Sequence, residues 1–194
     1  LYHNQLVATG MVNDGDDALN VNVDRSYRRG VEIMASWKTA KWLTLSGNVT
    51  LSQNRIQDYV DELRNSPTYG QNLGDMTISY SPSVMGAVTA DFHVKGFGLI
   101  WNTQYVGKQY FTNNEIEALS LDAYCVTNLD LGYTFKMCDD RSVRFGVVVN
   151  NLFSTLYESN GYGYSYMWDG ARYDEAFYFP QAPINVLANI TVNF

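Results

Sequence analysis

The chain has 194 residues and a formal net charge of −7, and 46% of its residues are apolar, 14% aromatic and 17% charged. This length suits one domain with a sizeable core, and the acidic balance argues against a nucleic-acid partner, which would need clustered Lys and Arg. No run approaches the ~20 apolar residues of a membrane helix, whereas a membrane-spanning strand needs only about 10 alternating residues.

The first half of the chain alternates apolar and polar residues with a period of two, which predicts β-strands. The predicted strands cover residues 2–11, 26–37, 43–54 and 84–94. The clearest is LTLSGNVTLSQN at 43–54, where Leu45 and Val49 share one parity and Asn48 and Thr50 share the other. Its polar face suits water or a polar lumen, and its apolar face must meet either a protein core or lipid.

The second half continues the pattern with strands at 97–105, 124–137, 143–150 and about 185–194. Short links follow the second, fourth and sixth strands, at 38–41, 95–96 and 138–141, and the other links are long, at 12–25, 58–83, 106–123 and 151–183. Short turns on one side and long loops on the other are typical of outer-membrane barrels. We therefore predict an all-β fold, an antiparallel up-and-down transmembrane β-barrel segment of eight strands.

Charge follows the same division between loops and strands. The ranges 13–25, 58–81, 108–122 and 151–183 hold 15 acidic and 4 basic residues, and the remainder holds 5 acidic and 9 basic ones. A Lys or Arg on the lipid face at the bilayer midplane costs about 2–4 kcal/mol, so charged residues should avoid that face. Arg29 is the one exception, because it shares the parity of the apolar residues on its strand. Aromatic residues near the short turns predict an interfacial girdle of Trp37, Trp42, Phe92, Phe97, Phe135 and Phe194.

Several short motifs occur in a recognisable order. They are DRSYRRGVE at 24–32, the 43–54 strand, YVGKQY at 105–110, VNNLF at 149–153 and a final strand that closes on Phe194. Together they resemble the C-terminal barrel of TonB-dependent outer-membrane receptors, in the form found in Bacteroides-like bacteria. The resemblance spans essentially all 194 residues.

The resemblance implies a plugged barrel of 22 strands, of which residues 1–194 would supply the last eight. The plug domain, the N-terminal strands and the energy-coupling box would then lie outside this chain. It implies import of a scarce ligand, such as a ferric siderophore, haem, cobalamin or a glycan, across the bacterial outer membrane. The implied partners are outer-membrane lipid, the plug of the same full-length protein, an inner-membrane energy-coupling protein and the outer-membrane insertion machinery.

The last strand resembles the terminal targeting and assembly signal of this family. An apolar edge strand with an aromatic end can be received by strand addition. The residues that would carry this role are Val186, Ala188, Ile190, Val192 and Phe194. The same pattern also suits an ordinary lipid-facing strand, and both roles can hold together.

The loop at 159–173, SNGYGYSYMWDGARY, concentrates aromatic rings with polar tips. Such rings can capture sugars, haem or aromatic chelates at a low entropic cost. The candidate ligand-binding residues are Tyr162, Tyr164, Tyr166, Trp168 and Tyr173. The alternative is that these rings pack the loop on itself or on neighbouring loops.

Catalytic and metal sites are not expected. Residues 13–17, NDGDD, lack the ligand spacing of a Ca²⁺ loop and favour a solvated acidic loop. His93 lies two residues from Asp91 on the polar parity, but no nucleophile on a strained turn accompanies them. We therefore expect no enzyme activity, no metal and no cofactor.

Two other architectures fit the alternation. A self-closed barrel of eight strands could serve as an adhesin or a membrane anchor, but it needs bulky interior residues. Small residues share the interior parity here, which favours a wide barrel: Ser46, Asn48, Thr50, Ser52, Gly98 and Gly132. A soluble lipocalin-like binder would instead bury the apolar face inside.

Overall fold

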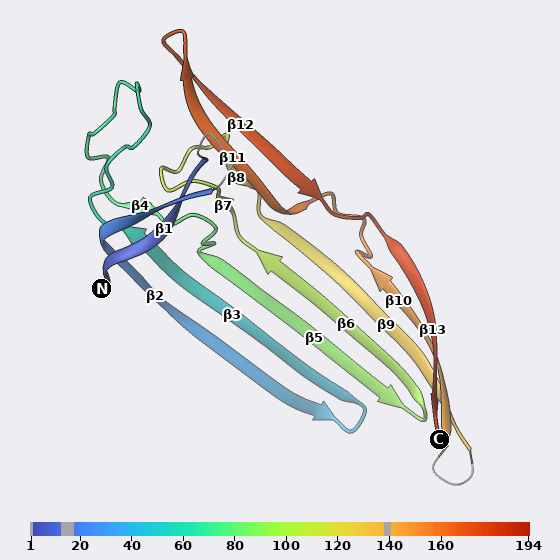
Figure 1. Cartoon of the computed structure of the whole chain (residues 1–194). Helices are drawn as coiled ribbons and strands as arrows, with labels where there is room; N and C mark the ends of the chain where they lie inside the picture. The colour runs from blue at the N-terminus through green and yellow to red at the C-terminus, as the bar shows by residue number, and fades with distance from the viewer. Residues whose placement is uncertain (1, 13–17, 138–140) are drawn as a thin grey trace.

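The computed structural model describes residues 2–12, 18–137 and 141–194, and their regular structure is β throughout (Figure 1). A nine-stranded sheet contains eight strands in sequential order, with β4 (Met76–Thr77) attached beside β3. The eight are β1 (Tyr2–Val12), β2 (Ala18–Ala40), β3 (Leu43–Ile56), β5 (Val84–Val94), β6 (Phe97–Val106), β9 (Tyr124–Lys136), β10 (Ser142–Asn150) and β13 (Asn185–Asn193). Each pairs antiparallel with the next, which confirms the predicted up-and-down sheet.

Two further hairpins lie at the long-loop end of the sheet (Figure 1). β7 (Gln109–Tyr110) pairs with β8 (Ser120–Leu121), and β11 (Glu158–Trp168) pairs with β12 (Ala171–Pro180). β1 and β13 form the two ends of the strand order, so the sheet is open. The described strands therefore do not form the self-closed eight-stranded barrel.

The strand registers gather the apolar residues on one face. Val49 pairs with Ile33, and Phe145 pairs with Ile190, so the same parity is kept from strand to strand. Side chains on this face are exposed: Leu45 and Val49 are each 36% exposed, Phe145 is 49% and Ile190 is 65% exposed. A soluble binder would have buried these side chains in a core, and the described sheet does not bury them.

The opposite face carries small and polar side chains. Thr89 pairs with Ser46 on one side and with Asn102 on the other, and the Asn102 amide donates to the Thr89 hydroxyl at 2.9 Å. Gly98, Gly132 and Gly146 follow one another across β6, β9 and β10. This is the polar face that the alternation predicts for the lumen.

The Arg144 guanidinium fills part of the space over that glycine row. Its Nη2 lies 2.5 Å from Asp130 Oδ1, and a Cβ at Gly132 would lie 2.5 Å from the same nitrogen. Asn189 accepts a longer hydrogen bond from Nη1, at 3.4 Å. The glycines therefore provide the room for a charged network on the polar face.

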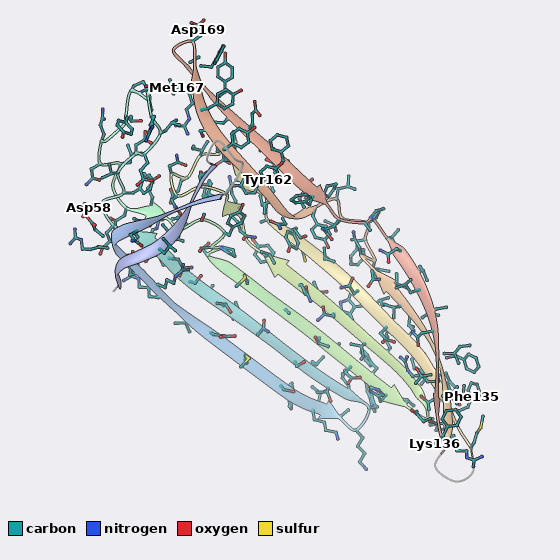
Figure 2. The ribbon with its side chains drawn as sticks, in the orientation of Figure 1. Asp58, Phe135, Lys136, Tyr162, Met167 and Asp169 are labelled. Atoms are coloured by element: carbon teal, nitrogen blue, oxygen red, sulfur yellow. The ribbon has the colours of Figure 1, made fainter. Side chains whose placement is uncertain are left out.

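The short-turn end agrees with the sequence. Lys95 and Gly96 form a turn with φ of 48° and 87°, both left-handed, as a two-residue hairpin requires. The first turn lies at 41–42, slightly later than predicted, and the third falls partly on residues 138–140, outside the described residues. Trp42 stacks on Phe92 at 5.9 Å, and Figure 2 shows Phe135 and Lys136 at this same end.

β2 begins earlier than the sequence analysis predicts. The predicted loop at 12–25 contains the start of β2, which begins at Ala18, and residues 13–17 lie outside the described residues. Leu19, Val21 and Val23 do alternate with polar residues, but the acidic residues nearby favoured a loop. Val23 and Ser26 are three residues apart and would lie on opposite faces of a regular strand, but both are buried. The alternation of buried and exposed residues therefore breaks at residues 24–25.

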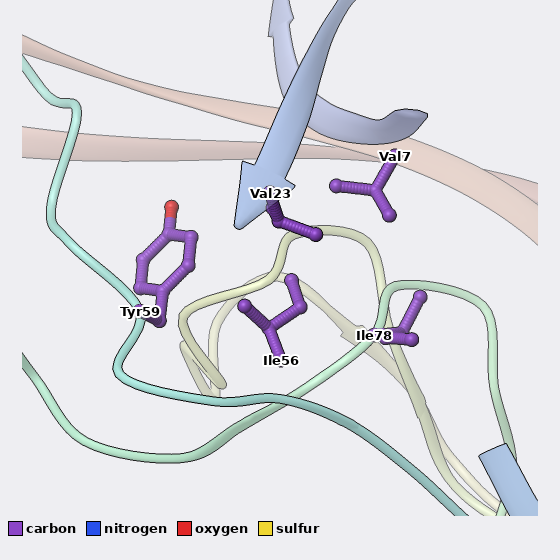
Figure 3. Close-up of a cluster of buried hydrophobic side chains, with 5 residues drawn as sticks. All are labelled: Val7, Val23, Ile56, Tyr59 and Ile78. Carbon is purple, nitrogen blue, oxygen red and sulfur yellow. The ribbon is translucent and has the colours of Figure 1, made fainter. Parts of the chain in front are cut away.

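The buried hydrophobic side chains of the described residues lie at the long-loop end. Val7 and Val23 meet Ile56, Tyr59 and Ile78, which come from β3 and the segment after it (Figure 3). A second cluster contains Phe111, Leu119 and Leu121. These two clusters hold the loops in place above the sheet and so position the candidate site.

Candidate functional site

The segment predicted as a loop at 159–173 is a β-hairpin. β11 and β12 pair from Glu158–Pro180 to Trp168–Ala171, joined by Asp169 and Gly170 with φ of 48° and 75°. An Asp-Gly pair between two alternating runs is a strong hairpin signal, so the sequence contained this element. The predicted loop therefore contains regular structure, because aromatic runs with a period of two flank the turn.

One face of the hairpin carries a row of stacked rings, which we call the aromatic ladder: Tyr162, Tyr164, Tyr166, Tyr173 and Phe177. The ring centroids of Tyr162 and Phe177 lie 4.9 Å apart, and those of Tyr166 and Tyr173 lie 5.5 Å apart, both nearly parallel. Figure 2 shows the hairpin rising from Tyr162 to its tip at Asp169. Four of the five predicted ligand-binding residues are thus brought together.

Trp168, the fifth of them, lies beyond the stacked rings. It has the same parity as the ladder and pairs with Ala171 beside the turn. Its side chain is 70% exposed. The structure therefore places a large, exposed indole at the tip of the hairpin.

A carboxylate lies in the middle of the ladder. Glu175 accepts hydrogen bonds from the hydroxyls of Tyr164, at 2.9 Å, and Tyr166, at 2.7 Å. The bond to Glu175 raises the pKa of Tyr166, because it favours the neutral phenol as the donor. The rings are thus fixed by stacking and by their polar tips, and they need little further ordering to meet a ligand.

The other face of the hairpin docks on the 107–121 segment. A Cβ at Gly161 would lie 2.8 Å from the Phe111 ring, and one at Gly163 would lie 2.8 Å from Leu119 Cδ2. The Tyr80 hydroxyl also donates to the Gly161 carbonyl at 3.0 Å. Glycine is therefore required where the hairpin approaches its support.

That support is itself tied to the sheet. Arg55 Nη1 lies 2.6 Å from Glu115 Oε1, and the Thr77 backbone N–H donates to the same oxygen at 2.9 Å. Asn113 accepts from the Ser79 backbone N–H at 2.8 Å. Hairpin, loops and sheet therefore form one connected assembly at this end.

A pocket at the base of the hairpin was not predicted. It has a volume of about 290 Å³ and opens on the polar face where β6, β9 and β10 end. Six carboxamide side chains line it, from Gln104, Asn128, Asn150, Asn151, Gln181 and Asn185. We call it the amide pocket.

The remaining predicted residues do not join this site. Val186, Ala188, Ile190 and Val192 lie on the apolar face of β13, and Phe194 follows the strand and is 99% exposed. Arg29, the exception on the apolar face, donates to Gln53 Oε1 at 2.9 Å from its Nε. Its guanidinium also lies 5.1 Å from the Tyr27 ring centroid, near the loop end.

His93 and Asp91 do lie together on the polar face. His93 Nδ1 is 2.5 Å from Asp91 Oδ1, far along the strands from the hairpin. Among the described residues there is no group of three or more His, Cys, Asp or Glu placed to hold a metal ion. Within the same residues, no helix is long and apolar enough to cross a membrane.

Comparison with known proteins agrees with this architecture. The family model described as TonB dependent receptor-like, beta-barrel matches residues 2–152. The siderophore receptor PiuA from Acinetobacter baumannii is a structural match with a TM-score of 0.68 and 14% identity, covering 98% of this chain and 24% of that one.

Two other solved structures match in the same way. BauA, the ferric preacinetobactin receptor of Acinetobacter baumannii, has a TM-score of 0.64 and 16% identity, covering 98% of this chain and 25% of that chain. The ferric-catecholate import receptor Fiu from E. coli has a TM-score of 0.62 and 16% identity, covering 98% and 24% respectively. The chain thus spans about a quarter of the length of these three structures.

Proposed function

Because the chain belongs to the TonB-dependent receptor-like β-barrel family, we propose that it forms part of an outer-membrane receptor that captures and imports a scarce external ligand. Receptors of this family lie in the bacterial outer membrane and are not enzymes. The candidate ligands are a ferric siderophore, haem, cobalamin or a glycan, and the structural relatives named above are described as siderophore or ferric-chelate receptors.

The observation that carries this proposal is the aromatic ladder, a fixed row of rings on a braced hairpin. Stacked rings with polar tips offer a ligand both apolar area and hydrogen-bonding groups. The ladder lies at the long-loop end of a sheet whose apolar face is outward, so it is on the side where external ligand arrives. In this proposal the ladder provides the first contact.

The ladder proposal is tested by replacing Tyr164 and Trp168 with Ala in the full-length receptor. Each truncation removes ring area from the contact, and we expect ligand affinity to fall about tenfold or more in the double variant. The measurement is concentration-dependent uptake of the ligand by whole cells. Tyr69→Ala is the matched control, since Tyr69 is 56% exposed but lies outside the hairpin. Unchanged uptake in the double variant would assign the rings to packing alone.

The same proposal extends to the rest of the receptor. We propose that residues 1–194 are the C-terminal portion of a larger barrel, whose remaining strands and plug domain belong to the full-length protein. The polar face, which carries the Asp130–Arg144 pair, suits contact with the polar surface of a plug. Energy would reach the plug from an inner-membrane coupling protein, so collapsing the proton gradient should stop uptake while binding persists.

The final strand is proposed as the segment received by the outer-membrane insertion machinery. Val186, Ile190 and Val192 expose their side chains, and β13 pairs with β10 on one side only. Deleting Phe194 from the full-length receptor should lower the amount of assembled receptor in the outer membrane, measured by its heat-modifiable mobility on gels. An Asn193→Ala variant serves as the control, and an unchanged level after the deletion would refute the assignment.

A further inference from the structure

We propose that the amide pocket binds an uncharged polyhydroxylated ring, such as one sugar unit of an oligosaccharide. This inference rests on the proposed function, because it names the class of ligand that the receptor would take. It concerns a site distinct from the aromatic ladder, with different residues on a different surface. The two can therefore be tested separately.

The first argument is the absence of charge. The part of the chain that lines the pocket contains no Asp, Glu, Lys, Arg or His. An anionic ferric chelate held there would have no cation beside it, and burying an unpaired charge is costly. The pocket therefore favours a neutral ligand.

The second argument is the unused hydrogen-bonding capacity of the amides. Within the described residues, no hydrogen bond occupies the Gln104 amide, and Asn128 uses only its Oδ1, which accepts from the Asn151 N–H at 2.9 Å. Asn150 donates from Nδ2 to Asn185 at 2.9 Å, which leaves its Oδ1 available. A carboxamide offers a donor and an acceptor side by side, and each sugar hydroxyl both donates and accepts.

The third argument is rigidity. Gln104, Asn128 and Asn150 belong to β6, β9 and β10, three strands joined by regular pairing. Sites built on strands are held more accurately than sites on loops. Asn151 reinforces the edge of the pocket, because its amide binds the Thr155 carbonyl at 2.9 Å and the Ala182 carbonyl at 3.1 Å.

The fourth argument is an aromatic wall. The rings of Tyr124 and Tyr157 lie 4.5 Å apart between centroids, at 33° to each other, and both line the pocket. The apolar face of a sugar ring can lie against such a surface while its hydroxyls meet the amides. At about 290 Å³ the pocket is just below the usual range of ligand sites, roughly 300–1,000 Å³, which suits one small ring.

The pocket also lies next to the base of the hairpin that bears the ladder. Tyr157, Ser159 and Gln181 come from the base of the hairpin that bears the ladder, and the Gln181 N–H donates to the Tyr157 carbonyl at 3.0 Å. The pocket opens on the polar face of the sheet. A ligand that leaves the ladder inward would therefore meet the amides next.

The test uses the purified full-length receptor in detergent, titrated by calorimetry. The probes are a panel of uncharged oligosaccharides from glucans, xylans and mannans, and a ferric tris-catecholate as the anionic comparison. Gln104→Leu removes one amide and Tyr124→Leu removes half of the aromatic wall. Gln71→Leu is the matched control, because Gln71 lies in a remote loop and binds the Pro67 carbonyl.

We expect at least one oligosaccharide to bind, with affinity reduced about threefold or more by Gln104→Leu and about tenfold by the double variant. Tyr124→Phe keeps the ring and should retain most of the affinity. Gln71→Leu should leave it unchanged. Heat-modifiable mobility of each variant checks that the barrel has assembled, so a folding defect is distinguished from a binding defect.

The opposing outcomes are distinct. If no oligosaccharide binds, or if one binds equally well to the Gln104→Leu/Tyr124→Leu variant, the sugar assignment is overturned. If the ferric chelate binds, only the ladder variants weaken it and no oligosaccharide binds, the proposed function stands and this inference fails. If the pocket variants weaken sugar binding and the ladder variants do not, this inference stands and the ladder proposal fails.

Discussion

Tyr59 illustrates how burial at the loop end changes a single side chain. It is 6% exposed and lies in the cluster with Val7, Val23, Ile56 and Ile78. Burial, followed by the charges of Glu62 and Asp61, raises its pKa to about 12, while Arg172 opposes the shift. The folded loop therefore holds this phenol neutral well above the ordinary pKa of tyrosine, about 10.

This shift predicts a loss of stability in strong alkali. Because the folded pKa is raised, its stabilising contribution is complete below pH 10 and is lost as the pH rises towards about 12. The contribution is at most about 2–3 kcal/mol. The measurement is the difference in ultraviolet absorbance between the wild-type and Tyr59→Phe receptors as the pH is raised. This difference should show one phenol that ionises near pH 12, and ionisation near pH 10 would contradict the prediction.

Single residues also mark the limit of the sequence analysis. The ladder residues are close in sequence, so their clustering at 159–173 was visible. The amide pocket was not, because Gln104, Asn128 and Asn150 come from three strands and meet only through the register. Asparagine and glutamine scattered on the polar parity look alike in sequence, whether they face open lumen or a pocket.

At the scale of elements, alternation predicted the sheet well and the loops poorly. The predicted strand at 84–94 coincides with β5, and β3 extends the predicted 43–54 by two residues. Alternation succeeds there because each strand has one apolar and one polar environment. The sequence analysis treats 159–173 as a loop, whereas the structure forms β11 and β12 there.

The glycines of β11 provide a prediction about hairpin docking. A Cβ at Gly163 would lie 2.8 Å from the Glu175 carbonyl oxygen and 2.8 Å from Leu119, so Gly163→Ala should cost about 1–3 kcal/mol. The 107–121 segment should then open and become sensitive to protease. The measurement is limited proteolysis of the full-length receptor.

Gly170→Ala is the matched control for this experiment. A Cβ at Gly170 meets nothing within 4 Å, and its φ of 75° strains only the turn. The 107–121 segment should therefore stay protected in that variant. Equal protection of the segment in both variants would mean that the hairpin is not held by its contact with Leu119.

At the scale of the whole molecule, the two faces of the sheet should differ in their tolerance of charge. Val49 and Thr50 are neighbours on β3 with opposite parity. An Arg at Val49 faces hydrocarbon and should cost about 2–4 kcal/mol, whereas an Arg at Thr50 faces the polar side and should be tolerated. The readout is the amount of heat-resistant receptor in the outer membrane, and equal loss in both variants would contradict the assigned orientation.

The concentration of buried hydrophobic side chains at one end of the described residues has a thermodynamic consequence. Unfolding exposes this apolar surface to water, which gives unfolding a large positive change in heat capacity. Side chains that face lipid are not withdrawn from water by folding within the bilayer, so they contribute little to this change. The clusters around Ile56 and Phe111 should therefore supply most of this quantity for the described residues. On cooling, the packing of these clusters weakens first, so the long-loop end would loosen in the cold while the sheet stays intact.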